Sequence, residues 1–364
     1  MPLSAFDPPA YSALLDEKCA AVKTLLSPYS PPEPEVFESS PEAFRMRAEF
    51  RIWHDGDNLD YVMFRRDDPK TPVPIHEFPI ACGTIQILMP KLKQRLQNSK
   101  ILRQKLFQIE FLSTTTCDTL VTLIYHRKLD EEWLQPAREL AQEFGVQVIG
   151  RSRKQKVIVE RDYVNESLHI EGIDYQYRHY EQAFTQPNAA VNIRMIEWAC
   201  QCATGLQADL LELYCGNGNF TLPLSKYFGT VIATELAKSS IKAARENLAA
   251  NAISNVEMIR LSAEEVTDAM TGVREFRRLT ELPKPLNDYA LNTVFVDPPR
   301  AGLDELTEKM VAGFDAIIYI SCNPETLAHN LVRLNQTHDI KRFALFDQFP
   351  YTHHMECGVF LKRR

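Results

Sequence analysis

Short apolar segments alternate with helical patterns through the second half of this 364-residue chain, and this alternation restricts the fold more than any other feature. The segments are rich in β-branched residues, as buried parallel strands are. They are Asp209–Leu213, Thr230–Thr234, Val256–Arg260, Leu291–Val296, Ala316–Ile320, Phe343–Phe346 and Cys357–Leu361. This order predicts a Rossmann-like α/β domain with a parallel, doubly wound sheet, whose last strand is antiparallel.

A different pattern precedes this domain. Residues 44–53 alternate apolar side chains with arginines, and a turn at 54–58 leads into residues 61–64, which predicts a hairpin with arginines on one face. Residues 84–106 predict one amphipathic basic helix, and the patterns after it predict an antiparallel α+β unit. We therefore expect three parts: residues 1–40, an N-terminal helix (Tyr11–Leu26) with a proline-rich connector; residues 41–182, the α+β unit; and residues 183–364, the Rossmann-like domain.

Basic side chains gather in the first half of the chain. The formal net charge of −7 argues mildly against a nucleic-acid partner, but its distribution matters more than its sum. Three clusters consist of Arg45, Arg47, Arg51, Arg65 and Arg66; Lys91, Lys93, Arg95, Lys100, Arg103 and Lys105; and Arg151, Arg153, Lys154 and Lys156. A solvated surface explains any one cluster equally well, whereas three together favour phosphate contacts. We therefore interpret residues 41–182 as an RNA-recognition domain.

The sequence lacks the usual features of membrane, secreted and metal-binding proteins. No apolar run approaches the roughly 20 residues that a membrane span needs, and the N-terminus has no signal pattern. The eight cysteines include no Cys-x-x-Cys spacing, so neither a zinc site nor an iron–sulfur cluster is indicated. Free thiols in a chain without a signal predict a reducing compartment. We expect a monomeric, cytoplasmic protein that binds no metal and no membrane.

A Gly-x-Gly loop follows the predicted strand at 209–213 and leads into a helix. Gly216 and Gly218 permit positive φ and a close approach of the backbone to a ligand. Glu235 ends the next predicted strand, where its carboxylate can accept hydrogen bonds from both ribose hydroxyls. The longer Gly-x-Gly-x-x-Gly pattern of dinucleotide sites is missing. The loop therefore favours S-adenosylmethionine over a dinucleotide or an unliganded turn.

Cys322 lies where a predicted strand meets a predicted helix. The strand covers residues 315–320, and Pro324 suits the first turn of a helix over residues 325–334. The carboxyl end of a strand is where open α/β sheets bind ligands, and a helix N-terminus lowers the pKa of a thiol. A buried structural cysteine is the alternative. Asp297, in Asp-Pro-Pro-Arg, ends another strand at this edge, but such a loop fits nitrogen and carbon methylation alike.

A thiolate, a base and a sulfonium suffice to methylate uracil at C5. Uracil C5 is a poor nucleophile until a thiolate adds to C6, and a base must then remove the C5 proton before the thiolate leaves. Cys322 is the candidate thiolate. The candidate base lies just before the final strand, where Glu356 is one choice and His353 and His354 are the others.

Four motifs occur together in this sequence: Phe-Thr-Gln-Pro-Asn around Gln186, Asp-Pro-Pro-Arg from Asp297, Ser-Cys-Asn-Pro around Cys322, and His-His-Met-Glu ending at Glu356. Together they resemble the RNA uracil-5-methyltransferases, and the likeness covers nearly the whole chain. The resemblance implies that Cys322 is the nucleophile and Glu356 the proton acceptor. The residues that it implies for S-adenosylmethionine binding, with Gly216 of the loop beside them, are Gln186, Tyr214, Asn219, Glu235 and Asp297.

The resemblance also implies a substrate. It points to uridine 54 in the T-loop of tRNA, with the similar T-arm of transfer-messenger RNA (tmRNA) as a second substrate. The alternative is 23S ribosomal RNA, although the N-terminal barrel and four cluster cysteines common in that branch are missing here. A cytosine-5 methyltransferase is disfavoured because Cys322 does not follow a proline. A non-catalytic RNA-binding protein and an accompanying RNA-folding activity stay open.

A uridine packed in a folded loop must flip out before its ring can be attacked. We expect Arg45, Arg47 and Arg51 of the predicted hairpin to contact phosphates, which position RNA without reading its sequence. Phe107 directly follows the predicted basic helix. It either fills the space that the flipped uridine leaves or packs in the core, and the sequence does not separate these roles.

Overall fold

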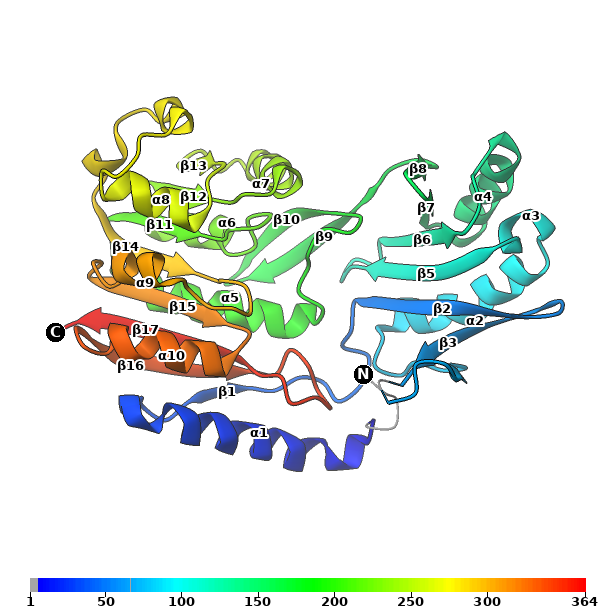
Figure 1. Cartoon of the computed structure of the whole chain (residues 1–364), viewed down its shortest axis with the longest axis horizontal. Helices are drawn as coiled ribbons and strands as arrows, with labels where there is room; N and C mark the ends of the chain where they lie inside the picture. The colour runs from blue at the N-terminus through cyan, green and yellow to red at the C-terminus, as the bar shows by residue number, and fades with distance from the viewer. Residues whose placement is uncertain (1–5, 66) are drawn as a thin grey trace. The chain divides into compact units, whose positions relative to one another are not determined.

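The computed structural model describes residues 6–65 and 67–364 (Figure 1). Residues 1–5 of the predicted N-terminal part, and Arg66 of the first basic cluster, lie outside the described residues. The chain divides into two compact units. Residues 40–167 and 178–189 form most of the first unit, and residues 9–39, 168–177 and 190–364 form the second. The domain boundaries drawn from the sequence stay predictions, and the two units divide the chain differently from them.

The second unit contains an eight-stranded sheet in the order β1-β16-β17-β15-β14-β11-β12-β13. All neighbouring strands are parallel except β17, which is antiparallel to both β15 and β16. The predicted Rossmann-like sheet and its antiparallel last strand are confirmed. The strands are β1 (Glu35–Phe37), β11 (Asp209–Leu213), β12 (Val231–Thr234), β13 (Val256–Ile259), β14 (Leu291–Val296), β15 (Ala316–Ser321), β16 (His338–Phe346) and β17 (Glu356–Arg363).

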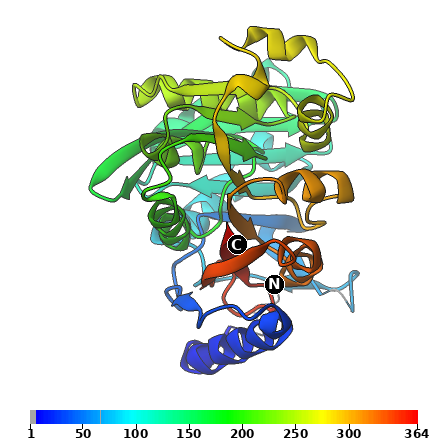
Figure 2. The same ribbon diagram turned by 90° about the vertical axis from the view of Figure 1, so that its left-hand side faces the viewer.

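Helices cover both faces of this sheet, with α5 on one face and α9 and α10 on the other (Figure 2). Trp198 of α5 packs edge-on against Phe346, with ring centroids 5.9 Å apart. A Cβ atom at Gly358 would lie 2.8 Å from the Trp198 ring, so close packing of α5 requires glycine there. The helices are α1 (Tyr11–Leu26), α5 (Ala189–Ala203), α6 (Thr221–Leu224), α7 (Lys238–Ala250), α8 (Ala263–Met270), α9 (Glu305–Val311) and α10 (Pro324–Leu334), and the 3-10 turns are η2 (Pro8–Ala10), η3 (Ser27–Tyr29), η4 (Ser225–Tyr227), η5 (Arg277–Glu281) and η6 (Leu286–Asp288).

The proline-rich connector is more ordered than the sequence predicts, because it forms the edge strand β1. Phe37 stacks on Phe346 with ring centroids 4.9 Å apart. The Glu35 carboxylate accepts hydrogen bonds from Arg342 Nε at 2.8 Å and from Trp198 Nε1 at 3.0 Å. Prolines are tolerated beside an edge strand, since their missing N–H groups interrupt no ladder. Contacts from residues about 300 positions away therefore give the connector its structure.

Helix α1 is tied to the loop that joins β16 to β17. Asp347 opens that loop, and its carboxylate accepts hydrogen bonds from Tyr11 Oη at 3.0 Å and from Lys18 Nζ. Lys18 Nζ also donates to the Phe349 carbonyl at 3.2 Å. The side chains of Lys18 and Asp347 are only 10% and 1% exposed, so this is a buried ion pair.

The first unit contains a seven-stranded sheet in the order β4-β3-β2-β5-β6-β7-β8. The predicted hairpin is confirmed: β2 pairs with β3 around a turn. The expectation of a purely antiparallel sheet is wrong, because β6 and β7 are parallel and α4 makes the crossover between them. The elements are β2 (Arg47–Asp55), β3 (Asn58–Phe64), β4 (Pro72–Pro74), α2 (Gly83–Gln97), α3 (Lys100–Arg103), β5 (Leu106–Ser113), β6 (Thr119–Tyr125), α4 (Glu131–Phe144), β7 (Gln147–Ser152) and β8 (Gln155–Ile158). A separate hairpin of β9 (Tyr163–Ile170) and β10 (Ile173–Tyr180) has residues in both units.

The single basic helix predicted over residues 84–106 is wrong. Helix α2 ends at Gln97, and Ser99 starts α3 by accepting a hydrogen bond from the backbone N–H of Leu102 at 3.3 Å. A serine at this position competes with helix continuation because its side chain caps a new helix. Lys105 then takes φ 54°, and β5 begins at the next residue. No helix of the described residues is long and apolar enough to cross a membrane.

The buried ion pair gives a prediction about stability. Lys18→Met leaves the Asp347 carboxylate buried without its cation, so we expect a loss of about 3–5 kcal/mol in the free energy of unfolding. Lys23→Met on the same helix is the control, because Lys23 and its partner Glu33 are 46% and 83% exposed. That change should cost less than about 1 kcal/mol. Urea denaturation measures both, and equal losses would contradict the role of the buried pair.

Candidate active site

Each of four neighbouring strands in the second unit is followed directly by a residue that the sequence analysis named as a candidate site residue. Thr234 of β12, Leu213 of β11, Val296 of β14 and Tyr319 of β15 lie in one row across the sheet. The residues that follow these strand ends are Glu235, Tyr214, Asp297 and Cys322. Because the strands are parallel, their carboxyl ends meet at one edge of the sheet. The structure therefore brings these four predicted site residues to the same edge.

The loop after β11 has a tightly constrained backbone. Tyr214, Gly216 and Gly218 have φ values of 60°, 57° and 89°. A Cβ atom at Gly218 would lie 2.7 Å from Leu222 Cδ1, so glycine is required both by the dihedral angle and by the packing. The Glu235 carboxylate holds this loop, since its Oε2 accepts a hydrogen bond from the Gly216 N–H at 3.2 Å.

Glu235 is engaged more fully than the sequence suggests. Its second oxygen, Oε1, accepts hydrogen bonds from the N–H groups of Leu236 and Ala237, both at 2.7 Å. A carboxylate offers about four acceptor positions, and three are taken here. One position remains for a ribose hydroxyl, and a second becomes available if the Gly216 bond opens.

Asn219 and Gln186 lie in different surroundings. Asn219 exchanges two side-chain hydrogen bonds with Asn192 of α5, each 2.9 Å long. This amide pair links the cofactor loop to α5. Gln186 is half-buried in the segment before α5, which belongs to the first unit. The structure thus brings Asn219, but not Gln186, into the unit that carries the other predicted cofactor residues.

Glu212 is a candidate site residue that the sequence analysis missed. It lies near the end of β11 and is 0% exposed, and among the described residues its carboxylate makes no hydrogen bond of good geometry, although the Thr221 side chain lies close enough to lower its pKa slightly. Burial, with the nearby Asp297 charge, raises the pKa of Glu212 to about 8. An unpaired buried carboxylate is costly and attracts a cation or a donor. S-adenosylmethionine carries an ammonium and a sulfonium, and a cation bound near Glu212 would favour its ionised form and lower its raised pKa.

The pairing of β15 with β17 brings Cys322 and Glu356 together. Ser321, the last residue of β15, pairs with Cys357 of β17. Since the two strands are antiparallel, continuing this register by one residue places Cys322 opposite Glu356. Cys322 is half-buried, and Glu356 is 4% exposed. The candidate nucleophile and the candidate base therefore face each other across one strand pair.

The thiol pKa differs from the expectation. The sequence predicts that the N-terminus of α10 lowers it, but burial raises the pKa of Cys322 to about 11, helped by the charges of Glu356 and Asp297. Arg300 acts in the opposite direction. The prediction of a lowered pKa is wrong because desolvation and two carboxylates outweigh the helix dipole.

The two carboxylates near Cys322 also hold their protons more tightly than usual. Burial raises the pKa of Glu356 to about 8, with a further increase from Asp297 and a decrease from Arg300. Burial raises the pKa of Asp297 to about 7. Perturbed groups gathered at one edge of a sheet are typical of an active site.

The histidines are less well placed to act as the base. His353 is exposed, and its ring lies beside that of His354 with centroids 4.1 Å apart. The Nε2 atom of His354 lies 3.3 Å from Arg300 Nη2. Neither histidine occupies the position opposite Cys322, so the geometry favours Glu356. Arg300 belongs to the Asp-Pro-Pro-Arg motif, but no local pattern singles it out.

In the first unit, Arg51 and Phe107 form part of a three-layer stack. The Arg51 guanidinium carbon lies 3.9 Å from the Phe107 ring centroid, and the His126 ring lies at the same 3.9 Å, tilted by 27°. Phe107 is half-buried, so it is neither a core residue nor a free stacking surface. The sequence analysis missed His126, because only the pairing of β5 with β6 brings it near Phe107.

The other two arginines of the hairpin, Arg45 and Arg47, bind backbone carbonyls. Arg45 Nε donates to the Arg47 carbonyl at 2.8 Å. Arg47 Nη1 donates to the Ala183 carbonyl at 3.0 Å. Both side chains are half-buried, which orders them but leaves less of each guanidinium for phosphate contacts.

Many of the clustered basic residues are already paired with acids. These ion pairs are Lys93–Asp60 at 2.5 Å, Arg95–Glu143 at 3.0 Å, Arg103–Asp57 at 3.0 Å and Arg151–Glu181 at 2.5 Å. Phosphates would have to compete with these carboxylates, so the clusters support RNA binding less strongly than their sequence suggests. Across residues 6–65 and 67–364, no group of three or more His, Cys, Asp or Glu side chains is arranged to hold a metal ion.

The chain is similar to known proteins over nearly its whole length. Residues 10–364 match the family model described as tRNA (Uracil-5-)-methyltransferase. A relative in Aromatoleum aromaticum, named tRNA/tmRNA (uracil-C(5))-methyltransferase, is 51% identical over 364 residues, which cover 100% of this chain and 98% of the relative. A relative of the same name in Vibrio cholerae is 53% identical over 363 residues, covering 98% of each chain.

A solved structure shares the fold. The chain is similar to the Pyrococcus abyssi tRNA (uracil-54, C5)-methyltransferase in complex with S-adenosyl-L-homocysteine, with a TM-score of 0.73 and 23% sequence identity. The match covers 96% of this chain and 83% of that one. The similarity over nearly the whole chain establishes the fold.

The buried Glu212 gives a prediction about pH. In the folded chain Glu212 keeps its proton up to about pH 8, whereas the unfolded chain loses it near pH 4.5. As pH rises from 4.5 to 8, the unfolded state binds fewer protons than the folded state, so stability falls. We expect Glu212→Gln to remove this effect and to become more stable than wild type by up to a few kcal/mol towards pH 8. Thermal melts from pH 5 to 8 measure the difference, and a constant difference would contradict the prediction.

Proposed function

The chain belongs to the tRNA (uracil-5-)-methyltransferase family, and on that premise we propose that it transfers a methyl group from S-adenosylmethionine to C5 of a uridine in tRNA. The observation that carries the proposal is the β15–β17 register, which, continued by one residue, sets Cys322 opposite Glu356 at the sheet edge where the loop at Tyr214–Asn219 also begins. Relatives that are 51–53% identical are named for tRNA and tmRNA. We infer uridine 54 of the T-loop as the target and the T-arm of tmRNA as a second substrate.

Cys322 acts as the nucleophile. Its thiol must lose a proton, which burial and the two carboxylates oppose and Arg300 favours. The Sγ atom then bonds to C6 of the uracil, and C5 becomes electron-rich enough to be methylated. When bound, S-adenosylmethionine supplies the electrophilic methyl group.

Glu356 acts as the base. Its carboxylate takes the proton from C5, the C5–H electron pair re-forms the C5–C6 double bond, and Cys322 leaves as a thiolate. The carboxylate must be ionised when it takes the proton, so its pKa of about 8 sets the lower limit of the pH range in which it can act as the base. Burial helps here, because a poorly solvated carboxylate is a stronger base.

The cofactor residues have separate roles. Gly216 and Tyr214 shape the loop that approaches the methionine part of S-adenosylmethionine. Glu235 uses its remaining acceptor position to accept a hydrogen bond from a ribose hydroxyl. Asp297 lies between the cofactor loop and Cys322 in the row of strand ends. Asn219 orders the loop through Asn192. Gln186 is proposed to bind S-adenosylmethionine because it lies in the Phe-Thr-Gln-Pro-Asn motif.

The first unit positions the RNA. Arg51, Phe107 and His126 offer a stack of planar groups next to which an RNA base can stack, while Arg45 and Arg47 remain candidates for phosphate contacts. The uridine must leave its own stack to reach Cys322. That the protein works as a monomer and in the cytoplasm stays a prediction.

Two substitutions test the chemistry. We expect Cys322→Ala to abolish methyl transfer to unmodified tRNA. Glu356→Gln should slow turnover by roughly 10²- to 10⁴-fold and accumulate a covalent protein–RNA adduct that resists denaturing gels. Cys117→Ala, at an exposed cysteine of the first unit, should retain full activity. If the methyl group were found in ribosomal RNA instead, the substrate assignment would be wrong. If the protein bound RNA but transferred no methyl group to any RNA, a non-catalytic role would be favoured.

The raised pKa of Glu356 predicts how turnover depends on pH. Below pH 8 this carboxylate is mostly protonated, so release of the C5 proton should rise steeply between pH 6 and 8. Release of tritium from tRNA labelled at uridine C5 measures this step. Adduct formation by Glu356→Gln should follow only the ionisation of Cys322 and continue to rise above pH 8. Identical pH profiles for the two reactions would contradict the assignment of Glu356 as the base.

A further inference from the structure

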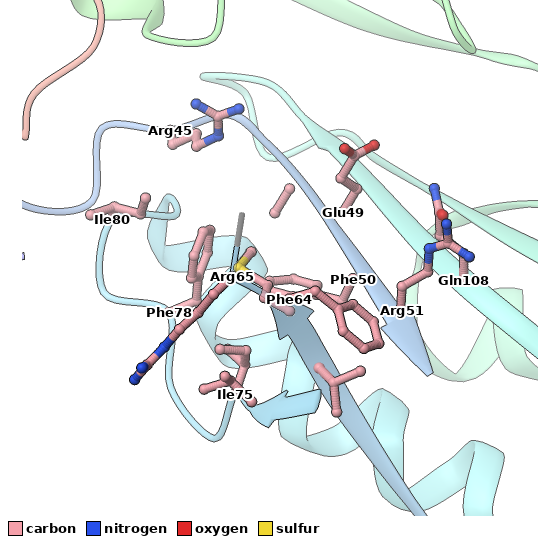
Figure 3. Close-up of a pocket in the computed structure, with 14 residues that line it drawn as sticks. Arg45, Glu49, Phe50, Arg51, Phe64, Arg65, Ile75, Phe78, Ile80 and Gln108 are labelled. Carbon is pink, nitrogen blue, oxygen red and sulfur yellow. The ribbon is translucent and has the colours of Figure 1, made fainter. Parts of the chain in front are cut away.

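The first unit contains a pocket that the methylation chemistry does not use. Strands β2 and β3 pair only from Arg51↔Val62 to the turn. Beyond that pair β3 turns to β4, while β2 continues along β5. The hairpin therefore splays open, and the opening holds a pocket of about 360 Å³ (Figure 3).

The pocket has an apolar floor and a charged rim. Buried side chains make the floor: Phe50, Val62, Ile75, Phe78 and Ile80, each 1–4% exposed. Phe64 is 38% exposed and lies at its side. Figure 3 shows Arg45, which precedes β2, and Glu49 and Arg51 of β2 on one side of the opening, with Phe78 and Ile75 on the other. Arg65 and Gln108 complete the rim.

This lining suits one kind of ligand. The volume falls at the lower end of the range for small-molecule sites, so the pocket can take one planar group but not a folded segment. Three guanidinium groups and one carboxylate give the rim a positive balance. An apolar interior beneath a positive rim matches a nucleobase attached to a phosphate backbone.

A second observation connects the pocket to RNA. Arg51 lines the pocket and also lies over Phe107, in the stack that includes His126. An RNA base that stacks against the Arg51–Phe107–His126 stack would therefore have a neighbouring nucleotide within reach of the pocket.

We propose that this pocket binds an unstacked nucleobase of the substrate RNA, while Arg45 and Arg65 hold the phosphates on either side. The proposal rests on the proposed function, since it takes the substrate to be RNA. The Glu49 carboxylate at the rim only accepts hydrogen bonds. It selects a base that presents an amino group, namely adenine, guanine or cytosine, and disfavours uracil, whose donor lies between two carbonyls.

Affinity for unmodified tRNA tests the pocket. Phe64→Ala should weaken binding roughly tenfold, the loss expected when one stacked base loses its aromatic partner. Val73→Phe, on the half-buried β4 side of the pocket, fills the space without removing a contact and should weaken binding similarly. Ile87→Ala is the control, because Ile87 is 61% exposed on α2 and lies outside the pocket. It should bind within about twofold of wild type, and thermal melts check that all three variants fold.

Abasic substitution identifies the nucleotide. Each position of the T-arm is replaced in turn by an abasic site, and binding is measured with wild type and with Phe64→Ala. We expect one position, carrying adenine, guanine or cytosine, where the abasic site weakens binding to wild type but adds no further loss in Phe64→Ala. Additive losses at every position would overturn the proposal.

The two proposals can fail separately. If Phe64→Ala and Val73→Phe bind tRNA as tightly as wild type while Cys322-dependent methylation persists, the pocket does not bind a base and the proposed function stands. If wild type binds RNA with the expected coupling to Phe64 but transfers no methyl group, the proposed function fails and the base pocket stands.

Discussion

The antiparallel pairing of β17 with β15 is the constraint on which the active site depends. Doubly wound sheets gather residues at the carboxyl ends of parallel strands, and that rule alone places Asp297, Tyr214 and Glu235 near Cys322. A base must also reach Cys322 from its other side, where β16, the next strand that runs parallel to β15, ends one strand farther away. Reversing the last strand solves this, because the first residue of β17 then faces the residue after β15. Helix α1 adds to this arrangement by binding Asp347 in the loop before β17.

The same edge of the sheet is electrostatically strained. Glu212, Asp297 and Glu356 are carboxyl groups whose pKa values burial raises to about 8, 7 and 8. A fold selected for stability alone would fill these positions with apolar side chains. Their presence makes sense if a positively charged ligand and a proton transfer belong at this edge, since both reward buried negative charge. Arg300 is the protein cation that offsets part of the strain.

The first unit shows why a count of charges is a weak guide to a nucleic-acid surface. Several lysines and arginines that look like a phosphate-binding surface in the sequence are paired with aspartates and glutamates in the fold. What distinguishes this unit is planar and apolar surface. The stack of Arg51, Phe107 and His126 adjoins a pocket in the splayed hairpin, and both share Arg51. Stacking contributes affinity that depends on the shape of the RNA, whereas exposed charges are screened by salt.

Local sequence patterns are enough to predict the features that depend on neighbouring residues. The alternation of strands and helices, the extents of α1 and β11, the hairpin of β2 and β3, and the positions of Glu235, Asp297 and Cys322 at strand ends all follow from local periodicity and turn residues. Which distant segments contact one another follows only from the folded chain. The fold shows that β1 joins the sheet, that Glu212 is fully buried, that His126 stacks on Phe107, and that the Cys322 pKa is raised rather than lowered. These features depend on strand register and on burial among residues far apart in the chain, and no local pattern encodes either of them.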